Sequence, residues 1–382
     1  MAEIKKRVLI VTTSCRPNVG GAETYLEDLC RYLRTNGHFV YILTYQPITT
    51  RARGAGLERD ENLEIHRFSW IGFNFFHKLE RFPVIFNFLY LTPYLFLRSF
   101  LFMLTHKNRV DVIDAQGLNG AFIAKFLKLV FKKRAVMSTM ALYSFKPGSF
   151  FARATRWILS SLDKVIAESE ESKGEIMAIG VAEDKIAVFN HWVDQDRFKP
   201  RRKAECKVKL GWEGKFIVLF VGRAIPIKGA ATLVEIARVV DPKIHFAFIS
   251  DAGPLVEFLE GAALVAENII FVGGVDYPDL YLYYNAANIF VIPSQYEEGV
   301  ARVMLEALSS GTPVIGSNRG AIPSVLDASV SILVEPNFDE LKKAIEFLYT
   351  NPEELKKLTN NCRDYAVKHF NLDNARMIVD NY

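Results

Sequence analysis

Short runs of apolar, often β-branched residues alternate along the chain with longer stretches in which apolar residues recur at helical spacing. The short runs predict buried strands, and their alternation with helical segments is typical of parallel sheets covered by helices. The first predicted strands are Val8–Thr12, Phe39–Thr44, Val110–Asp114, Ala135–Thr139, Lys164–Ala167 and Ile186–Phe189. A second set follows at Phe216–Val221, His245–Ile249, Ile269–Val272, Ile289–Ile292, Pro313–Ile315 and Ile332–Val334.

The restart of the pattern after residue 200 predicts two doubly wound α/β domains. A length of 382 residues fits this, since a domain has roughly 150 residues. Ligands of open α/β sheets bind beyond the carboxyl ends of the strands. Two such domains facing one another would therefore create an interdomain cleft for a ligand.

Composition narrows the class of protein. With 50% hydrophobic and 24% charged residues, the chain is globular rather than disordered or fibrous. The four cysteines lie far apart, without a CxxC pair or a histidine at metal-ligand spacing. We therefore expect reduced thiols, a cytoplasmic protein and no bound metal.

The net charge is only +4, but the positive charge is concentrated in one stretch of the chain. Between Ile65 and Ser160 there are 14 Lys and Arg residues but only three acidic residues. Such a stretch predicts an anionic partner, either a membrane surface or nucleic acid. Because the chain has no zinc-finger spacing, RNP-like signature or basic zipper, we expect no nucleic acid and favour the membrane.

Phe82–Thr105 lies within this basic stretch and is long and apolar enough to span a bilayer. A single crossing would place predicted strands of one sheet on opposite sides of the membrane. We therefore predict one or two helices lying in the interface, the alternative being a buried core helix. The residues expected to contact the acceptor or the membrane are Phe86, Phe88, Arg98, Lys107 and Arg109.

Two loops that follow predicted strands could hold phosphate groups. Gly20-Gly21 opens a helix after the first strand, where backbone N–H groups and the helix N-terminus attract anions. Ordinary turn geometry is the alternative. Arg223 and Lys228 follow the strand Phe216–Val221, and two cations there suit a diphosphate whose charge grows as it leaves. Solvated loop charges are the alternative for this pair.

Two acidic residues follow the strand Ile289–Ile292. Glu298 falls on a loop and Glu306 within the next helix. Carboxylates in these positions could accept hydrogen bonds from sugar hydroxyls and from a ribose diol. The alternative is a helix N-terminal acid and an unrelated surface glutamate.

Together these features resemble the retaining glycosyltransferases of family 4, which have the GT-B fold of two facing Rossmann-like domains. The similarity covers nearly the whole chain. It rests on Gly20-Gly21-Ala22-Glu23, Gly222-Arg223 with Lys228-Gly229, Asp251-Ala252-Gly253-Pro254, Glu298 with Glu306, and Gly311-Thr312-Pro313-Val314.

The resemblance implies domains at residues 1–198, facing the acceptor and membrane, and 199–366, binding a nucleoside diphosphate sugar. Residues 367–382 would form a C-terminal helix returning to the first domain. Arg223 and Lys228 would stabilise the diphosphate, Glu298 would contact the transferred sugar and Glu306 would hold the ribose. The implied donor-binding set is Gly20, Gly21, Gly222, Arg223, Lys228, Gly253, Glu298, Gly299, Val300, Ala301 and Glu306. The resemblance implies no metal and no cofactor.

The preferred hypothesis is a retaining hexosyltransferase of polysaccharide or glycolipid biosynthesis, peripheral at the inner face of the plasma membrane. Its acceptor would be a lipid-linked sugar or a glycolipid, while the base and sugar of the donor stay open. Met140 and Ser324 replace a histidine and a glutamate common in the family, and Asp114 and Gln116 stand where histidines are frequent. These differences support an alternative, a non-catalytic subunit that binds a nucleotide sugar. A nucleotide-sugar epimerase is a third hypothesis.

Overall fold

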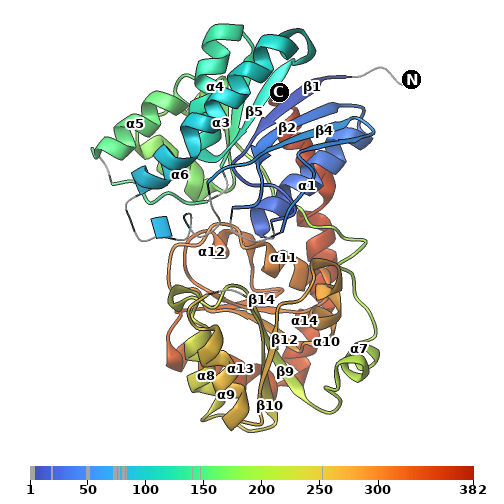
Figure 1. Ribbon diagram of the computed structural model, residues 1–382. Helices are drawn as coiled ribbons and strands as arrows, with labels where there is room; N and C mark the ends of the chain where they lie inside the picture. The colour runs from blue at the N-terminus through green and yellow to red at the C-terminus, as the bar shows by residue number, and fades with distance from the viewer. Residues whose placement is uncertain are drawn as a thin grey trace. The chain divides into compact units, whose positions relative to one another are not determined.

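The computed structural model describes residues 5–18, 20–48, 52–71, 75, 78–79, 82, 84–139, 141–146, 148–251 and 253–382. The chain divides into two compact units (Figure 1). The first unit contains Met1–Asn190 and Asp373–Tyr382, and the second contains His191–Leu372. Each unit has its own sheet, as the sequence pattern predicts.

The first unit is built on an eight-stranded sheet with the order β3-β4-β2-β1-β5-β6-β7-β8. All its neighbouring strands are parallel except β3 and β4. The strands are β1 Arg7–Val11, β2 Phe39–Tyr45, β3 Leu57–Asp60, β4 Leu63–Phe68, β5 Val112–Gln116, β6 Arg134–Ser138, β7 Lys164–Ala167 and β8 Ile186–Val188.

Helices α3, α4 and α5 follow one another along this sheet (Figure 1), and α4 contacts both of the others. Their apolar side chains form one core with alternate strand residues, among them Leu9, Leu43 and Ile113. This burial explains why the predicted strands are continuous apolar runs. The helices of the unit are α1 Gly21–Thr35, α3 Val84–His106, η1 Lys107–Arg109, α4 Gly117–Phe131, α5 Phe150–Leu159, α6 Glu170–Ala178 and η2 Glu183–Lys185.

The second unit has a six-stranded parallel sheet with the order β11-β10-β9-β12-β13-β14. Ile217 and Leu219 of β9 pack in one core, and the alternate residues Val218 and Phe220 pack in another, so both faces of the sheet are covered. The strands are β9 Phe216–Val221, β10 Ile244–Ile249, β11 Ile269–Gly273, β12 Ile289–Ile292, β13 Val314–Ser317 and β14 Ser331–Val334. The helices are α7 Lys203–Leu210, η3 Pro226–Lys228, α8 Ala230–Ala237, α9 Val256–Val265, η4 Tyr277–Asp279, α10 Leu280–Ala286, α11 Arg302–Ser309, α12 Ile322–Val325, α13 Phe338–Thr350 and α14 Pro352–His369.

Every strand predicted from the apolar runs is present, with ends that differ by up to two residues. The prediction missed β3 and β4. All four residues of β3 are exposed, and β4 alternates between buried and half-buried positions, so neither forms a short apolar run. Together they form the antiparallel edge of the first sheet.

Helix α3 joins β4 to β5, and both strands belong to the same sheet as β1. By length and composition it is long and apolar enough to cross a membrane, and 39% of its most apolar 18-residue stretch is buried within the protein. Because β1 pairs directly with β5, a single crossing would pull this sheet apart. The structure therefore contradicts the fully buried core helix and agrees with a helix that has one exposed apolar side.

The division between the units falls at residue 190, whereas the similarity placed it at 198. Val193 and Phe198 are buried in the second unit, and the Val193 N–H donates to the Phe370 carbonyl at 3.1 Å. After α14 the chain returns to the first unit through η5 Leu372–Ala375 and α15 Arg376–Val379. Thus α14 belongs to the second unit, and the returning part is short.

Tyr382 fixes the returning segment to the first sheet. Its hydroxyl donates to Asp114 Oδ2 at 2.8 Å, and Lys6 Nζ donates to its main-chain oxygen at 2.8 Å. Gln116 also donates to Asp114 Oδ2, at 3.0 Å. Burial raises the pKa of Asp114 to about 7, although both hydrogen bonds oppose the shift.

This raised pKa predicts that the first unit loses stability as the pH rises from about 4 to 7. In this pH range the Asp114 carboxyl keeps its proton in the native protein but has released it in the unfolded chain. The free energy of unfolding therefore falls by at most about 1.4 kcal/mol for each unit of rising pH. Asp114→Asn should remove this dependence. The measurement is urea unfolding between pH 4 and pH 8, with exposed Asp276→Asn as the control. Parallel pH dependences of Asp114→Asn and wild type would contradict the prediction.

Candidate functional site

The candidate site of the second unit lies where the winding of its sheet reverses. Strands β10 and β11 lie on one side of β9, and β12 lies on the other. Ligands of open parallel sheets bind at the carboxyl edge of such a switch point. The loop with Arg223 and Lys228 follows β9, and the loop with Glu298 follows β12, so the topology brings these predicted residues together.

Lys228 and Glu298 form an ion pair between Nζ and Oε1. Glu298 is buried, and its other carboxylate oxygen accepts a hydrogen bond from the Ser294 hydroxyl. The Lys228 ammonium also lies 5.2 Å from the centre of the Tyr296 ring. Burial raises the pKa of Tyr296, and the charge of Glu298 adds to the shift. The carboxylate is thus held between a cation and a hydroxyl, with an aromatic ring beside them.

Main-chain geometry holds the β9 and β12 loops against each other. Gln295 N–H donates to the Ile227 carbonyl at 2.8 Å. Gly229 follows η3 with φ 75°, and a Cβ there would lie 2.2 Å from the Pro293 oxygen. A larger residue would therefore separate Lys228 from Glu298.

A third loop, after β13, supports Glu298 from its main chain. Ala321 N–H donates to the Glu298 carbonyl at 2.7 Å, and Gly320 N–H donates to the Glu297 carboxylate at 2.6 Å. Gly320 has φ 54°, and a Cβ there would lie 2.1 Å from the Glu298 oxygen. Sequence analysis missed Gly320, although the run Asn318-Arg319-Gly320 after a strand is a turn signal that marks such positions.

Arg223 is exposed next to these loops. Its guanidinium makes no hydrogen bond or ion pair with another residue that the structure describes. Leu255 N–H donates to the Ala224 carbonyl at 2.9 Å, which brings the predicted donor residue Gly253 next to the β9 loop. The predicted Gly222 directly follows β9, at the base of the same loop. A basic side chain is therefore available at the edge where phosphates would lie.

Glu306 lies deeper than the loops, on α11, and only 3% of its surface is exposed. The Tyr284 hydroxyl donates to Glu306 Oε2 at 2.9 Å, and burial raises the pKa of that tyrosine. The alternative of an unrelated surface glutamate is therefore wrong. The remaining predicted donor residues, Gly299, Val300 and Ala301, lead from Glu298 into α11, and Val300 packs in the core. Sequence analysis missed Tyr284, because nothing local marks it as a partner of Glu306.

The first unit has its own switch point, between β1 and β5. A hollow of about 150 Å³ lies there, at the edge where Gly20 and Gly21 start α1. Its lining is Thr12, Thr13, Ser14, Ala22, Leu26, Gln116, Gly117 and Asn119. Five of these residues carry hydroxyl or amide side chains, which suit the hydroxyls of a sugar.

A carboxylate already lies beside the Gly20-Gly21 turn. Glu23, in the first turn of α1, accepts a hydrogen bond from the Ser14 hydroxyl, and Asn18 donates to that hydroxyl at 3.0 Å. A Cβ on Gly20 would lie 2.5 Å from Glu23 Oε2. A phosphate that approached this turn would meet the carboxylate as well as the N–H groups. Met140, which replaces a histidine that is common in the family, lies outside the described residues.

The predicted membrane residues lie on and after α3. Phe86 is 48% exposed, whereas Phe88 is half-buried, edge-on to Phe122 with ring centres 5.4 Å apart. The Arg98 guanidinium lies 4.4 Å from the centre of the Phe68 ring. Lys107 and Arg109 are exposed on η1. Phe88 thus contributes to packing between α3 and α4 rather than to the exposed side.

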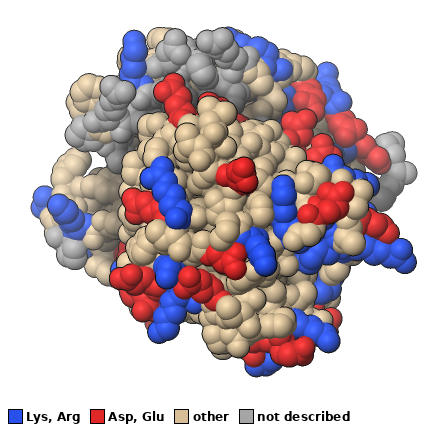
Figure 2. Space-filling model, turned by 90° about the horizontal axis from the view of Figure 1, so that it is seen from below, with Lys and Arg blue, Asp and Glu red and all other residues tan. Residues whose placement is uncertain are grey.

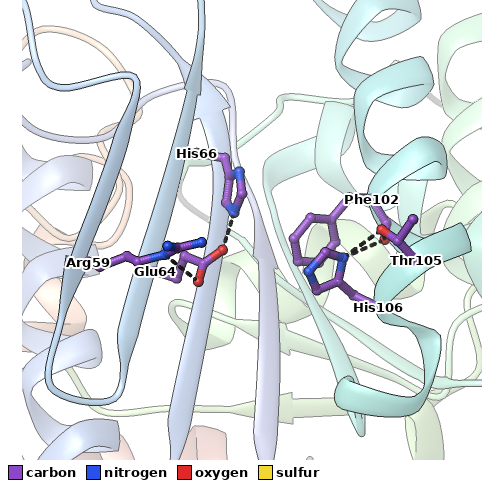
Figure 3. Close-up of polar contacts among 6 residues, drawn as sticks. All are labelled: Arg59, Glu64, His66, Phe102, Thr105 and His106. Atoms are coloured by element: carbon purple, nitrogen blue, oxygen red, sulfur yellow. Dashed lines mark hydrogen bonds and ion pairs between the residues drawn. The ribbon is translucent and has the colours of Figure 1, made fainter.

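A different group of titratable side chains lies on β3, β4 and the end of α3 (Figure 3). His66 Nε2 is 2.6 Å from Glu64 Oε1, and Arg59 donates to Oε2 of the same carboxylate at 3.1 Å. The His106 ring stacks on Phe102 with centres 4.1 Å apart. None of these residues was predicted for the site, and none lines the polar hollow of the first unit. Among the described residues, no group of three or more His, Cys, Asp or Glu side chains could hold a metal ion.

Two family models match the two halves of the chain. Residues 19–197 match Glycosyltransferase Family 4, and residues 202–365 match Glycosyl transferases group 1. A curated relative, YtcC of Bacillus subtilis, is 30% identical over 57% of this chain. The chain spans only 59% of the length of that relative.

Solved structures resemble the whole chain. Sucrose-phosphate synthase from Thermosynechococcus elongatus superposes with a TM-score of 0.79 at 22% identity, covering 98% of each chain. HepE of Anabaena, solved in complex with UDP-glucose, gives a TM-score of 0.76 at 18% identity and also covers 98% of each chain. These similarities establish the fold. With its first half matching Glycosyltransferase Family 4, its second half matching Glycosyl transferases group 1, and two Rossmann-like units, this chain belongs to the GT-B glycosyltransferases of group 1/family 4.

Proposed function

We propose that this protein is a retaining, metal-independent glycosyltransferase that moves a sugar from a nucleoside diphosphate sugar to a lipid-linked or glycolipid acceptor. It would act at the cytoplasmic face of the membrane. The observation that carries the proposal is the pairing of Lys228 with buried Glu298 beside exposed Arg223, at the switch point of the second sheet.

The two cations suit the chemistry of the leaving group. As the bond between the sugar C1 and the diphosphate oxygen breaks, negative charge develops on the diphosphate. Arg223 and Lys228 would stabilise this charge, which is the task of a divalent ion in other transferases. The Lys228 ammonium would then be shared between Glu298 and the phosphates.

Glu298 would position the transferred sugar. Ser294 and Lys228 fix both of its carboxylate oxygens, so the group is oriented before the donor binds. In a retaining front-face transfer, the acceptor oxygen bonds to C1 on the side that the diphosphate leaves. The acceptor proton passes to the departing phosphate oxygen, so no protein base is required. The similarity of the fold to HepE, solved with UDP-glucose, supports a nucleotide sugar as the donor.

The membrane part of the proposal rests on α3. Along this helix, large apolar side chains that include Phe86, Leu89, Leu97, Leu101 and Leu104 are about half exposed. A row of this size is typical of a surface that meets a partner or a lipid interface. Lys107 and Arg109, just beyond the helix, would face anionic headgroups.

The first prediction of this proposal is donor-dependent release of a nucleoside diphosphate. Purified protein should release it from one member of a panel of nucleotide sugars, and a membrane lipid extract should stimulate release. Chelation with EDTA should leave the rate unchanged. Binding of a donor without release, with or without lipid, would instead favour the non-catalytic subunit, and epimerisation of the donor would favour an epimerase.

The second prediction concerns Glu298. Glu298→Gln keeps the shape of the side chain but removes its charge, so kcat should fall by about 100-fold or more, while donor affinity changes by less than about tenfold. The matched control is Glu267→Gln, because this carboxylate is exposed and lies outside the loops that hold Glu298. Equal rates for Glu298→Gln and wild type would refute the role of Glu298.

The third prediction separates the acceptor from the donor. Replacing exposed Phe86 and Leu89 with serine should raise the apparent KM for a lipid acceptor by about tenfold, since two apolar contacts are lost. Donor affinity should stay the same. The control replaces Leu264 and Val265, an exposed apolar pair on α9 of the second unit. Equal effects on KM from both pairs would argue against a membrane role for α3.

A further inference from the structure

A second hollow of the first unit lies at the opposite end of α4 from the small polar one. Its volume is about 650 Å³. The lining is Lys125, Lys128, Leu129, Lys132, Lys133, Arg134, Ser161 and Asp163. Five cations and one carboxylate give it a net charge of +4. By contrast, basic and acidic side chains are interspersed on the face of the molecule drawn in Figure 2.

Only part of this positive charge is neutralised within the protein. Lys128 Nζ pairs with Asp163 Oδ1 at 2.8 Å. Arg134 Nε donates to the Asn381 carbonyl at 3.1 Å, which leaves its charge in place. Lys132 and Lys133 form no hydrogen bond or ion pair with side chains in the described ranges. An anion in the hollow would therefore find two available ammonium groups and a guanidinium.

Lys125 is held in an unusual way for a surface lysine. Its Nζ donates to the Trp157 carbonyl at 2.7 Å and lies 3.2 Å from the centre of the Trp157 ring. Burial lowers the pKa of this lysine. The cation is thus held between α4 and α5, against Trp157.

One structural explanation covers some of these residues. Cations near the last turn of a helix interact favourably with its exposed carbonyls, and α4 ends at Phe131. That explanation fits Lys128 and Lys132. It does not fit Lys133 and Arg134, which lead into β6, nor Lys125, which is bound to Trp157.

The basic hollow adjoins exposed apolar side chains. Leu129, Val130 and Trp157 are 63%, 53% and 54% exposed. Ring contacts join the helices behind them, with Phe100 and Phe131 centres 5.4 Å apart and those of Phe126 and Trp157 6.2 Å apart. The neighbouring α3, which packs against α4, also carries exposed Leu101 and Leu104. Cationic and apolar groups side by side match the boundary between lipid headgroups and acyl chains.

We infer that this hollow binds the phosphate headgroup of an anionic membrane lipid, while Leu129, Val130 and Trp157 contact the acyl region. Nucleic acid is the other polyanion, but Leu129 and Val130 at the rim offer no surface on which bases stack, and the Trp157 ring already contacts the Lys125 ammonium. This hollow is distinct from the polar hollow at the other end of α4, because α4 has 15 residues and so separates the two by about 22 Å. The inference deepens the proposed membrane function and rests on it, although lipid binding can be measured without turnover.

The test is co-sedimentation of the full chain with vesicles. Vesicles of phosphatidylcholine containing phosphatidylglycerol should bind wild type, and pure phosphatidylcholine should bind it weakly. Lys132→Gln with Lys133→Gln should weaken binding to the anionic vesicles by about 10- to 30-fold, since each lysine near the surface contributes attraction. The matched control is Lys356→Gln with Lys357→Gln, an adjacent exposed pair on α14 of the second unit.

Two further arms identify the ligand. Leu129→Ser should also weaken vesicle binding while all charges are kept, and millimolar inorganic phosphate should compete poorly. Equal loss in both lysine pairs would overturn the inference, as would full competition by inorganic phosphate. Tighter binding of an RNA oligonucleotide, lost in the Lys132 and Lys133 variant, would overturn it as well. Donor binding is measured for each variant as a check that the chain is folded. Sugar transfer is measured separately, and a chain that binds vesicles but transfers no sugar would refute only the proposed transfer.

Discussion

Parallel strand pairing is the constraint on which the rest of this structure depends. It brings the carboxyl ends of all strands of the second sheet to one edge, and with them the loops that follow β9, β12 and β13. Residues far apart in sequence thereby meet, as Lys228 and Glu298 do across 70 positions. The same rule in the first unit places the polar hollow and the Gly20-Gly21 turn at a single edge.

The sequence predicted most of the fold because buried parallel strands have a clear local signal. Phe216–Val221 and Ile289–Ile292 are apolar throughout, since both faces of the sheet are covered by helices. Exposure removed that signal from β3, whose side chains face solvent. The domain boundary was harder to predict, because Val193 and Phe198 look like linker residues until their burial in the second core is known.

The candidate site was predictable in its charged residues but not in its supports. Arg223, Lys228 and Glu298 stand out as polar groups that follow apolar strands. Their arrangement depends on groups with no such mark, the Ser294 hydroxyl and the Gly320 main chain, which only tertiary contacts reveal. The aromatic stretch was similarly ambiguous, because helical spacing alone did not show that Phe88 packs inward while Phe86 faces outward.

The return of Asp373–Tyr382 to the first unit has a consequence for biosynthesis. The second unit is one continuous segment, His191–Leu372, and can fold as soon as it leaves the ribosome. The first unit emerges earlier, yet Asp114 lacks the Tyr382 hydroxyl until the segment Asp373–Tyr382 has been translated, after the second unit. The half of the protein that is made first therefore gains one of its buried hydrogen bonds only after the whole second unit has been made.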